Sequence, residues 1–78
     1  MVNYNELKCG MVYYDTKEKD NVIYIGKDGM KTDVYMFCME YSMTIIVWYE
    51  HHELDRLNEV SLNYNIRNIF NKTDNEDN

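Results

Sequence analysis

Two adjacent histidines and a glutamate, His51, His52 and Glu53, are the residues that most directly suggest metal chemistry. A zinc-binding helix of the metalloprotease type requires the pattern His-Glu-x-x-His, because residues four apart lie on one face of a helix. In this chain Arg56 stands at the place of the second histidine. We therefore predict no metal site and no cofactor, and we interpret the two histidines as part of a solvated turn.

The serines, cysteines and glycines give no better support for nucleophilic catalysis. Ser42 and Ser61 lie outside any Gly-x-Ser-x-Gly turn, and the three glycines form no phosphate-binding loop. Cys9 and Cys38 make no Cys-x-x-Cys pair, and both lie in strand-like runs, where we expect small buried hydrophobic residues with reduced thiols. The sequence predicts no catalytic residue, and we expect a protein that is not an enzyme.

Carboxylates gather in the same segment as the histidines. Glu50, Glu53, Asp55 and Glu59 surround one basic residue, Arg56. A general acid–base pair needs one carboxyl group with a raised pKa in a dry pocket, and nothing in the sequence indicates such a pocket. Three interpretations stay open: a solvated acidic face, a patch that docks a basic surface, or carboxylates that imitate the phosphates of nucleic acid.

Aromatic residues are the second candidate for recognition. The chain contains eight Tyr, two Phe and one Trp, and so small a core has no room for all of them. Tyr and Trp are favoured at protein interfaces, because the ring packs while its polar group stays wet. We predict a partner-binding surface of aromatic and acidic side chains, whose candidate residues are Tyr41, Trp48, Tyr49, Glu50, Glu53, Asp55 and Glu59.

The charge balance limits the class of partner. Fourteen acidic residues face eight basic ones, for a formal net charge of −6. Nucleic acid and anionic lipid are disfavoured, since affinity for phosphate depends on Lys and Arg, whereas a basic protein surface is favoured. No stretch approaches the roughly 18 consecutive apolar residues of a membrane helix. The first residues do not resemble a secretory signal, so we expect a cytoplasmic protein without membrane contact.

The first half of the chain contains two alternating runs and one continuous β-branched and aromatic run, both of which are typical of β-strands. Strands are predicted at 7–15, 22–27 and about 31–39, with a polar loop at 16–21. Gly26 favours a bulge or a sharp bend, and Asp28-Gly29 favours the tight turn of a hairpin. Both faces of the third strand are apolar, which predicts a central strand or one that is covered on both sides.

The second half combines one more strand, a helical turn and a last strand. A short turn at 40–42 precedes a predicted strand at 44–49. Leu54, Leu57 and Val60 have helical spacing, which predicts one or two helical turns over 52–59. Strict alternation from Val60 onward predicts a half-buried strand. We expect one domain over residues 1–70, and a disordered acidic tail at 71–78.

Five short strands with a helical turn before the last one predict an all-β fold, a small five-stranded SH3-like barrel. Closing a sheet in this way hides its edges, which suits a short β-chain. An OB-type barrel is the main alternative. It normally carries a longer helix between its third and fourth strands, and the segment from Glu40 to Met43 is too short for one.

Two runs, Leu7-x-x-Gly10-x-Val12-Tyr13-Tyr14 and Glu53-Leu54-x-x-Leu57-x-Glu59-Val60, resemble segments of small SH3-like barrel proteins that low-GC bacteriophages carry. The resemblance covers about residues 6–66 and contains no site motif that can be transferred. It implies a phage or mobile-element accessory protein that binds a basic host protein and inhibits or redirects it, in the host cytoplasm. A nucleic-acid-binding barrel and a self-associating homodimer are the alternatives.

Overall fold

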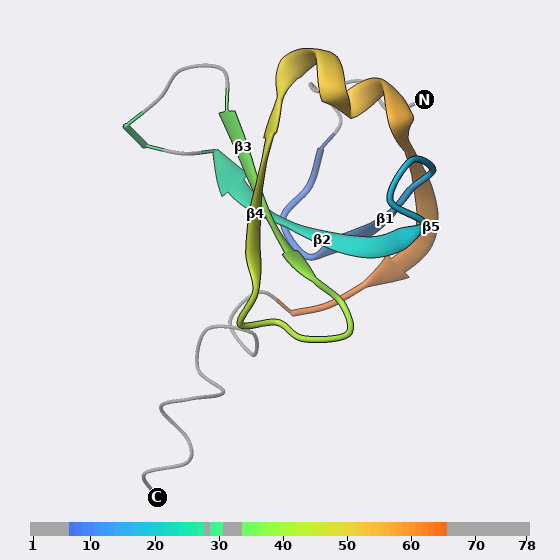
Figure 1. The fold of residues 1–78 in the computed structure, drawn as a ribbon. Helices are drawn as coiled ribbons and strands as arrows, with labels where there is room; N and C mark the ends of the chain where they lie inside the picture. The colour runs from blue at the N-terminus through green and yellow to red at the C-terminus, as the bar shows by residue number, and fades with distance from the viewer. Residues whose placement is uncertain (1–6, 28, 31–33, 66–78) are drawn as a thin grey trace, which may run out of the picture.

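The structure, a computed structural model, describes residues 7–27, 29–30 and 34–65. These residues form one antiparallel sheet and one 3-10 helix. The elements, in chain order, are β1 (Met11–Asp15), β2 (Asp20–Lys27), β3 (Val34–Met39), β4 (Ile46–Glu50), η2 (His51–Arg56) and β5 (Leu57–Asn63). The strand order β4-β3-β2-β1-β5 shows that β5 returns to pair with β1 (Figure 1).

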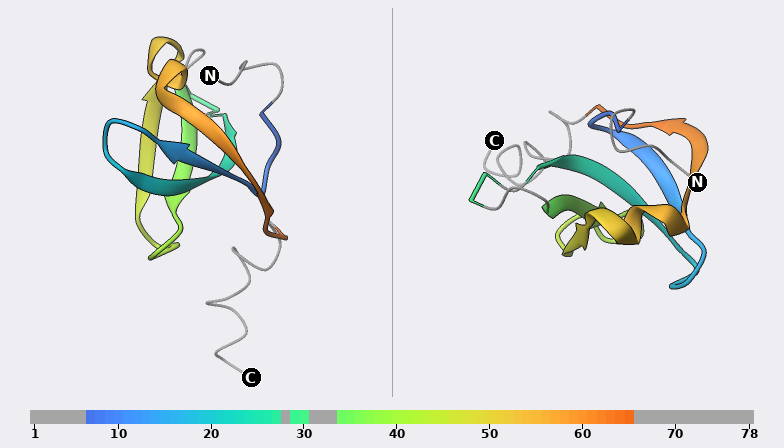
Figure 2. Two further views of the ribbon diagram at one scale, coloured as in Figure 1. Left: turned by 90° about the vertical axis from the view of Figure 1, so that its right-hand side faces the viewer. Right: turned by 90° about the horizontal axis from the view of Figure 1, so that it is seen from above.

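The sheet is strongly curved, and η2 leads from the end of β4 to the start of β5 across its open side (Figure 1 and Figure 2). β4 and β5 are the two edge strands of the described sheet. The mainly β fold, with five strands and a short helical turn before the last, confirms the fold class that the sequence predicts. η2 is shorter than the predicted turn, and both Leu54 and Leu57 of the helical spacing are buried.

The hairpin of β2 and β3 contains the predicted bulge. The register of the two strands shifts between Tyr24 and Gly26, and Gly26 has φ of +132°, a conformation that favours glycine. Asp28 of the predicted turn lies outside the described residues. The antiparallel pairing of β2 with β3 is the pairing that a hairpin at this place produces.

The core lies mainly inside the curl of the sheet. Aromatic rings dominate it: Phe37 meets Tyr13 edge to face at 6.2 Å and Tyr49 at 4.8 Å between ring centroids. The buried residues of this cluster are Tyr13, Val22, Tyr24, Tyr35, Phe37, Met39, Tyr49, Leu54 and Leu57. A smaller cluster, Val12, Ile23 and Cys38, lies on the other face of the sheet. Both faces of β3 are therefore covered, as its two apolar faces predict.

The expected burial of both cysteines is only half right. Cys38 is buried, but Cys9 is exposed, because the chain before β1 is a turn and not a strand. In that turn the Met11 N–H donates to the Lys8 carbonyl at 3.1 Å, and Gly10 has φ of +94°. β1 therefore begins at Met11, four positions later than the predicted strand at 7–15.

The last strand is not half-buried, which corrects a second expectation. β5 begins at Leu57, earlier than predicted, and Val60 and Leu62 are 37% and 44% exposed. The physical reason is an irregular pairing with β1, in which Tyr13 faces Glu59 while Met11 faces Asn63. Glu59 shares the face of its partner Tyr13, so Val60, one position later, points to the outer face of the sheet, and the bulge around Ser61, whose φ is 64°, then interrupts the alternation.

Candidate binding groove

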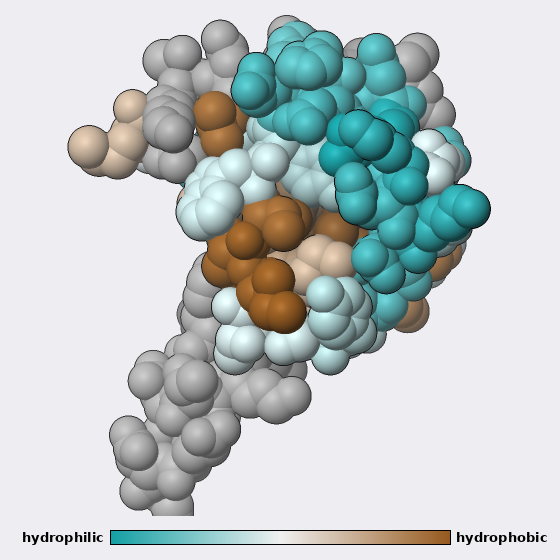
Figure 3. Space-filling view, in the orientation of Figure 1, coloured by the Kyte–Doolittle hydropathy of each residue, from teal (hydrophilic) through white to brown (hydrophobic). Residues whose placement is uncertain are grey.

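A groove of about 340 Å³ with an apolar floor opens between β4 and the turn that joins β1 to β2. The buried side chains of Val22, Met39 and Tyr49 form its floor together with the partly buried Val47. Figure 3 shows this face of the molecule, with apolar residues gathered in a central hollow and hydrophilic residues above it and to its right. The volume is near the lower end for ligand pockets, which suits one or two side chains.

Exposed aromatic rings stand at one rim of the groove. Trp48 is 56% exposed and Tyr41 is 69% exposed. Trp48 points outward because successive side chains of a strand alternate, and its neighbours Val47 and Tyr49 face the core. Large aromatic side chains beside an apolar hollow are typical of a surface that binds another molecule.

Acidic side chains stand at the opposite rim. Glu18 in the β1–β2 turn and Asp20 at the start of β2 both line the groove. Lys17 and Lys19 belong to the same turn but are not among the lining residues. Among the described residues that line the groove, the only cationic one is Arg56, and its guanidinium is paired with Asp15 at 3.0 Å and with Glu53 at 3.3 Å. The groove therefore presents negative charge to a ligand.

Asp15, the last residue of β1, is a fully buried carboxylate behind this groove. Its Oδ2 accepts a hydrogen bond from the Tyr49 hydroxyl at 2.6 Å, and both its oxygens accept from Arg56 Nε at 3.0 and 3.1 Å. The backbone N–H groups of Lys17 and Glu18 donate to Oδ1 at 2.9 and 3.0 Å. One carboxylate thus holds together β4, η2 and the β1–β2 turn, which are the walls of the groove.

These contacts determine the charge states of the cluster. Burial by itself raises the pKa of Asp15, but the hydrogen bonds from Tyr49, from the Glu18 backbone and from Arg56 outweigh it and leave that pKa below its ordinary value. Burial, and then the bond to Asp15, raise the pKa of Tyr49 far above its ordinary range. Asp15 is therefore ionised and Tyr49 remains a neutral donor at physiological pH.

The structure separates the residues that the sequence groups into one acidic and aromatic surface. Tyr41 and Trp48 lie at the groove. Tyr49 is only 4% exposed, so its ring belongs to the core and the groove floor and its hydroxyl is taken by Asp15. Glu59 is exposed on β5 and lines neither the groove nor the hollow described next.

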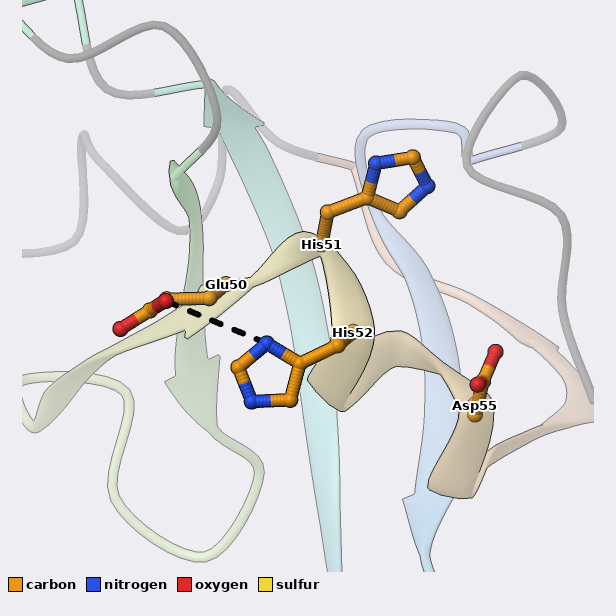
Figure 4. A pocket seen from close by; sticks show the side chains of 4 residues that line it. All are labelled: Glu50, His51, His52 and Asp55. Carbon is orange, nitrogen blue, oxygen red and sulfur yellow. Dashed lines mark ion pairs between the residues drawn. The ribbon is translucent and has the colours of Figure 1, made fainter.

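The remaining acidic candidates lie around η2. Glu50 and Asp55 line a second hollow together with His51 and His52 (Figure 4). Glu53 is engaged within the helix, where it accepts hydrogen bonds from the Glu50 N–H at 2.7 Å and from Arg56 at 3.3 Å. Glu50, Glu53 and Asp55 therefore lie together around η2, whereas Glu59 lies on β5 outside both hollows.

The two histidines point in different directions from the start of η2 (Figure 4). His52 Nδ1 lies 3.9 Å from Glu50 Oε1, and both side chains are largely exposed, so this pair contributes little to stability. Within the described part of the chain, no group of three or more His, Cys, Asp or Glu side chains is placed to hold a metal ion. No helix among the described residues has the length and apolar character to cross a membrane.

Asp15, Glu18 and Asp20 are not among the site residues that the sequence predicts. An acidic residue directly before a polar turn is a signal for a side chain that caps the turn, and Asp15 does so through the Lys17 and Glu18 amides. No local signal reveals that Tyr49, 34 positions away, and Arg56, 41 positions away, complete its surroundings.

Comparisons of this chain with protein-family models, with curated proteins and with solved structures found no match.

Proposed function

We propose that this chain is a protein-binding module without catalytic activity, and that the groove beside β4 is its binding site. One observation carries the proposal: exposed Trp48 and Tyr41 stand beside an apolar hollow whose other rim is acidic. Burying a tryptophan that is already fixed on a rigid strand costs little conformational entropy, so such residues often dominate binding energy.

The charge around the groove supports a protein partner with a basic surface. Glu18 and Asp20 repel phosphate, and the guanidinium of Arg56 is already paired with two carboxylates. Stacking of nucleic-acid bases on aromatic rings normally goes together with a cationic track for the backbone. A nucleic-acid-binding barrel is therefore the weaker alternative. The net charge of −6 likewise favours a basic protein partner over nucleic acid.

The wider context of the proposal comes from the sequence resemblance. We propose a phage or mobile-element accessory protein that acts in the host cytoplasm on a host protein, which it inhibits or redirects. For imitation of nucleic acid we propose a different surface, the outer side of η2, where Glu50 and Asp55 are exposed beside the two histidines. It is tested separately from the groove.

Affinity capture from a bacterial lysate with site-directed variants tests the proposal. We expect Trp48→Ala and the double variant Glu18→Lys/Asp20→Lys to lose a specifically captured protein, because each removes one rim of the groove. Tyr14→Ala and Glu59→Lys are matched controls, since Tyr14 is an exposed aromatic residue and Glu59 an exposed acid, both outside the groove. The controls should retain the captured protein.

The other outcomes of this experiment decide between sites. Capture that is insensitive to the groove variants but lost in Glu50→Lys/Asp55→Lys would transfer the binding site to η2. Binding of labelled oligonucleotides at about 50 mM salt, where phosphate contacts are strong, would favour the nucleic-acid alternative. A sedimentation coefficient that rises with protein concentration would favour self-association.

A further inference from the structure

The outer edge of β4 borders the groove and has no partner strand in the described part of the sheet. β4 pairs with β3 on one side only, because it ends the order β4-β3-β2-β1-β5. An unpaired edge presents a row of backbone N–H and C=O groups that a further strand can bond.

The pairing with β3 identifies which backbone groups point outward. The Met39 N–H donates to the Ile45 carbonyl at 3.0 Å, so these two residues are bonded across the ladder. Because bonded positions alternate along an antiparallel pair, Val47 and Tyr49 also direct their backbone groups at β3. Ile46 and Trp48, which lie between them, direct their N–H and C=O groups away from β3, toward the free edge.

The groove supplies a place for the side chains of an added strand. Strands pair about 4.8 Å apart, so a strand beside Ile46 and Trp48 would cover the mouth of the hollow. Alternate side chains of that strand would project onto the apolar floor. Glu18 and Asp20 face the added strand from the other rim of the groove. Their negative charges favour a ligand that carries Lys or Arg.

We infer that the ligand of the groove is an extended basic peptide segment with alternating apolar side chains, which adds to the sheet as a strand beside β4. The inference rests on the proposed function and specifies how that function is performed. A second copy of this chain is a poorer occupant, because it also carries a net charge of −6 and the acidic residues Glu18 and Asp20. The two copies would therefore repel each other.

Amide hydrogen exchange measured by NMR tests the free edge directly. In the free protein at low concentration, the Ile46 and Trp48 amides should exchange fast, while the Val47 and Tyr49 amides are protected by β3. A synthetic peptide of about six residues, a usual strand length, in which lysine and valine alternate, should then protect Ile46 and Trp48. Protection of these two amides already in the free chain would overturn the inference. If that protection rose with protein concentration, the occupant would be a second copy, and otherwise a segment of the chain itself.

Peptide variants test whether the backbone makes the contact. N-methylation of one alternate set of peptide amides should weaken binding about tenfold, and methylation of the other set less than about twofold, because only one set faces β4. Equal effects of the two sets, or equal binding of a peptide with glutamate in place of lysine, would overturn the inference.

The two proposals fail in distinguishable ways. If the peptide binds but both methylated sets bind alike, the groove still recognises protein and only the added strand is wrong. The groove is not a binding site if Trp48→Ala changes neither peptide binding nor capture from lysate, and if the peptide leaves the Ile46 and Trp48 amides of the unsubstituted chain unprotected. The proposed function then fails as well.

Discussion

At the scale of single residues, Asp15 has the greatest influence on this fold. A buried carboxylate is costly unless its oxygens are fully hydrogen-bonded, and those of Asp15 accept bonds from Tyr49, Arg56 and two backbone amides. No buried side-chain oxygen or nitrogen of the described residues lacks a partner. The network stabilises one arrangement of the groove walls, so its loss affects binding and stability together.

We predict that Asp15→Asn lowers the free energy of unfolding by about 2–3 kcal/mol at neutral pH, since it removes bonds to a charged acceptor and leaves Arg56 without its buried partner. Urea unfolding followed by circular dichroism measures this change. Tyr49→Phe keeps the ring in the core and should cost less, because it removes only one of the bonds to Asp15. An unchanged stability in both variants would contradict the network.

The pH dependence of stability provides an independent check on Asp15. Its pKa is lower in the folded protein than in the unfolded chain, so the unfolded chain binds more protons at acid pH. The stabilisation from Asp15 is therefore fully present above about pH 4 and is lost as the pH falls further. Thermal unfolding at a series of pH values should show a steeper acid loss in the natural sequence than in Asp15→Asn. Parallel curves would disprove the lowered pKa.

At the scale of elements, the junction of β1 with β5 depends on Gly10. Its carbonyl accepts a hydrogen bond from the Tyr64 N–H at 2.7 Å, and its N–H donates to the Tyr24 carbonyl at 2.8 Å. A Cβ at this position would overlap the Tyr64 carbonyl oxygen, and the φ of +94° is strained for any other residue. The end of β5 can therefore approach β1 only where residue 10 has no side chain.

We predict that Gly10→Ala destabilises the protein by at least about 2 kcal/mol, from the positive φ together with the steric overlap. For a domain of this size the melting temperature should fall by about 10 °C. Differential scanning calorimetry measures the shift, and Lys8→Ala in the same turn, at an exposed position, serves as the control. Equal melting temperatures for the two variants would show that β5 pairs with β1 without the close contact between residue 10 and the Tyr64 backbone.

At the scale of the whole molecule, the excess of acidic residues affects how fast a basic ligand binds. A net charge of −6 attracts a basic ligand over a distance that salt shortens, so it influences the rate of encounter more than the lifetime of the complex. The exposed position of Trp48 makes its fluorescence a probe of arrival at the groove.

We predict that the association rate of the lysine–valine peptide falls about tenfold between roughly 50 and 500 mM salt, with little change in its dissociation rate. Stopped-flow fluorescence of Trp48 measures both rates. The Glu18→Lys/Asp20→Lys variant should flatten this salt dependence more than Glu59→Lys, because its charges lie at the site. A dependence that resides only in the dissociation rate would contradict long-range attraction.

The sequence by itself determined the local part of this protein. Continuous β-branched and aromatic runs predict β2 and β4, and alternating side chains predict β3, because such residues fit the pleated surface of a strand. Gly26 predicts a bulge because few other residues adopt its φ. The spacing of Leu54 and Leu57 predicts the helical turn, and both residues are buried, but Leu57 already belongs to β5.

Only the tertiary structure decided which of these residues meet. The alternation of β5 does not bury Val60 and Leu62, because the register with β1 turns Val60 to the outer face and a bulge then interrupts the pairing. Tyr49 lies inside while Trp48 lies outside, and Asp15 becomes a buried centre through residues far from it in the chain. Periodicity is a property of neighbouring residues, whereas a groove is made by segments that are distant in sequence. Its residues are therefore known only once the sheet has curled.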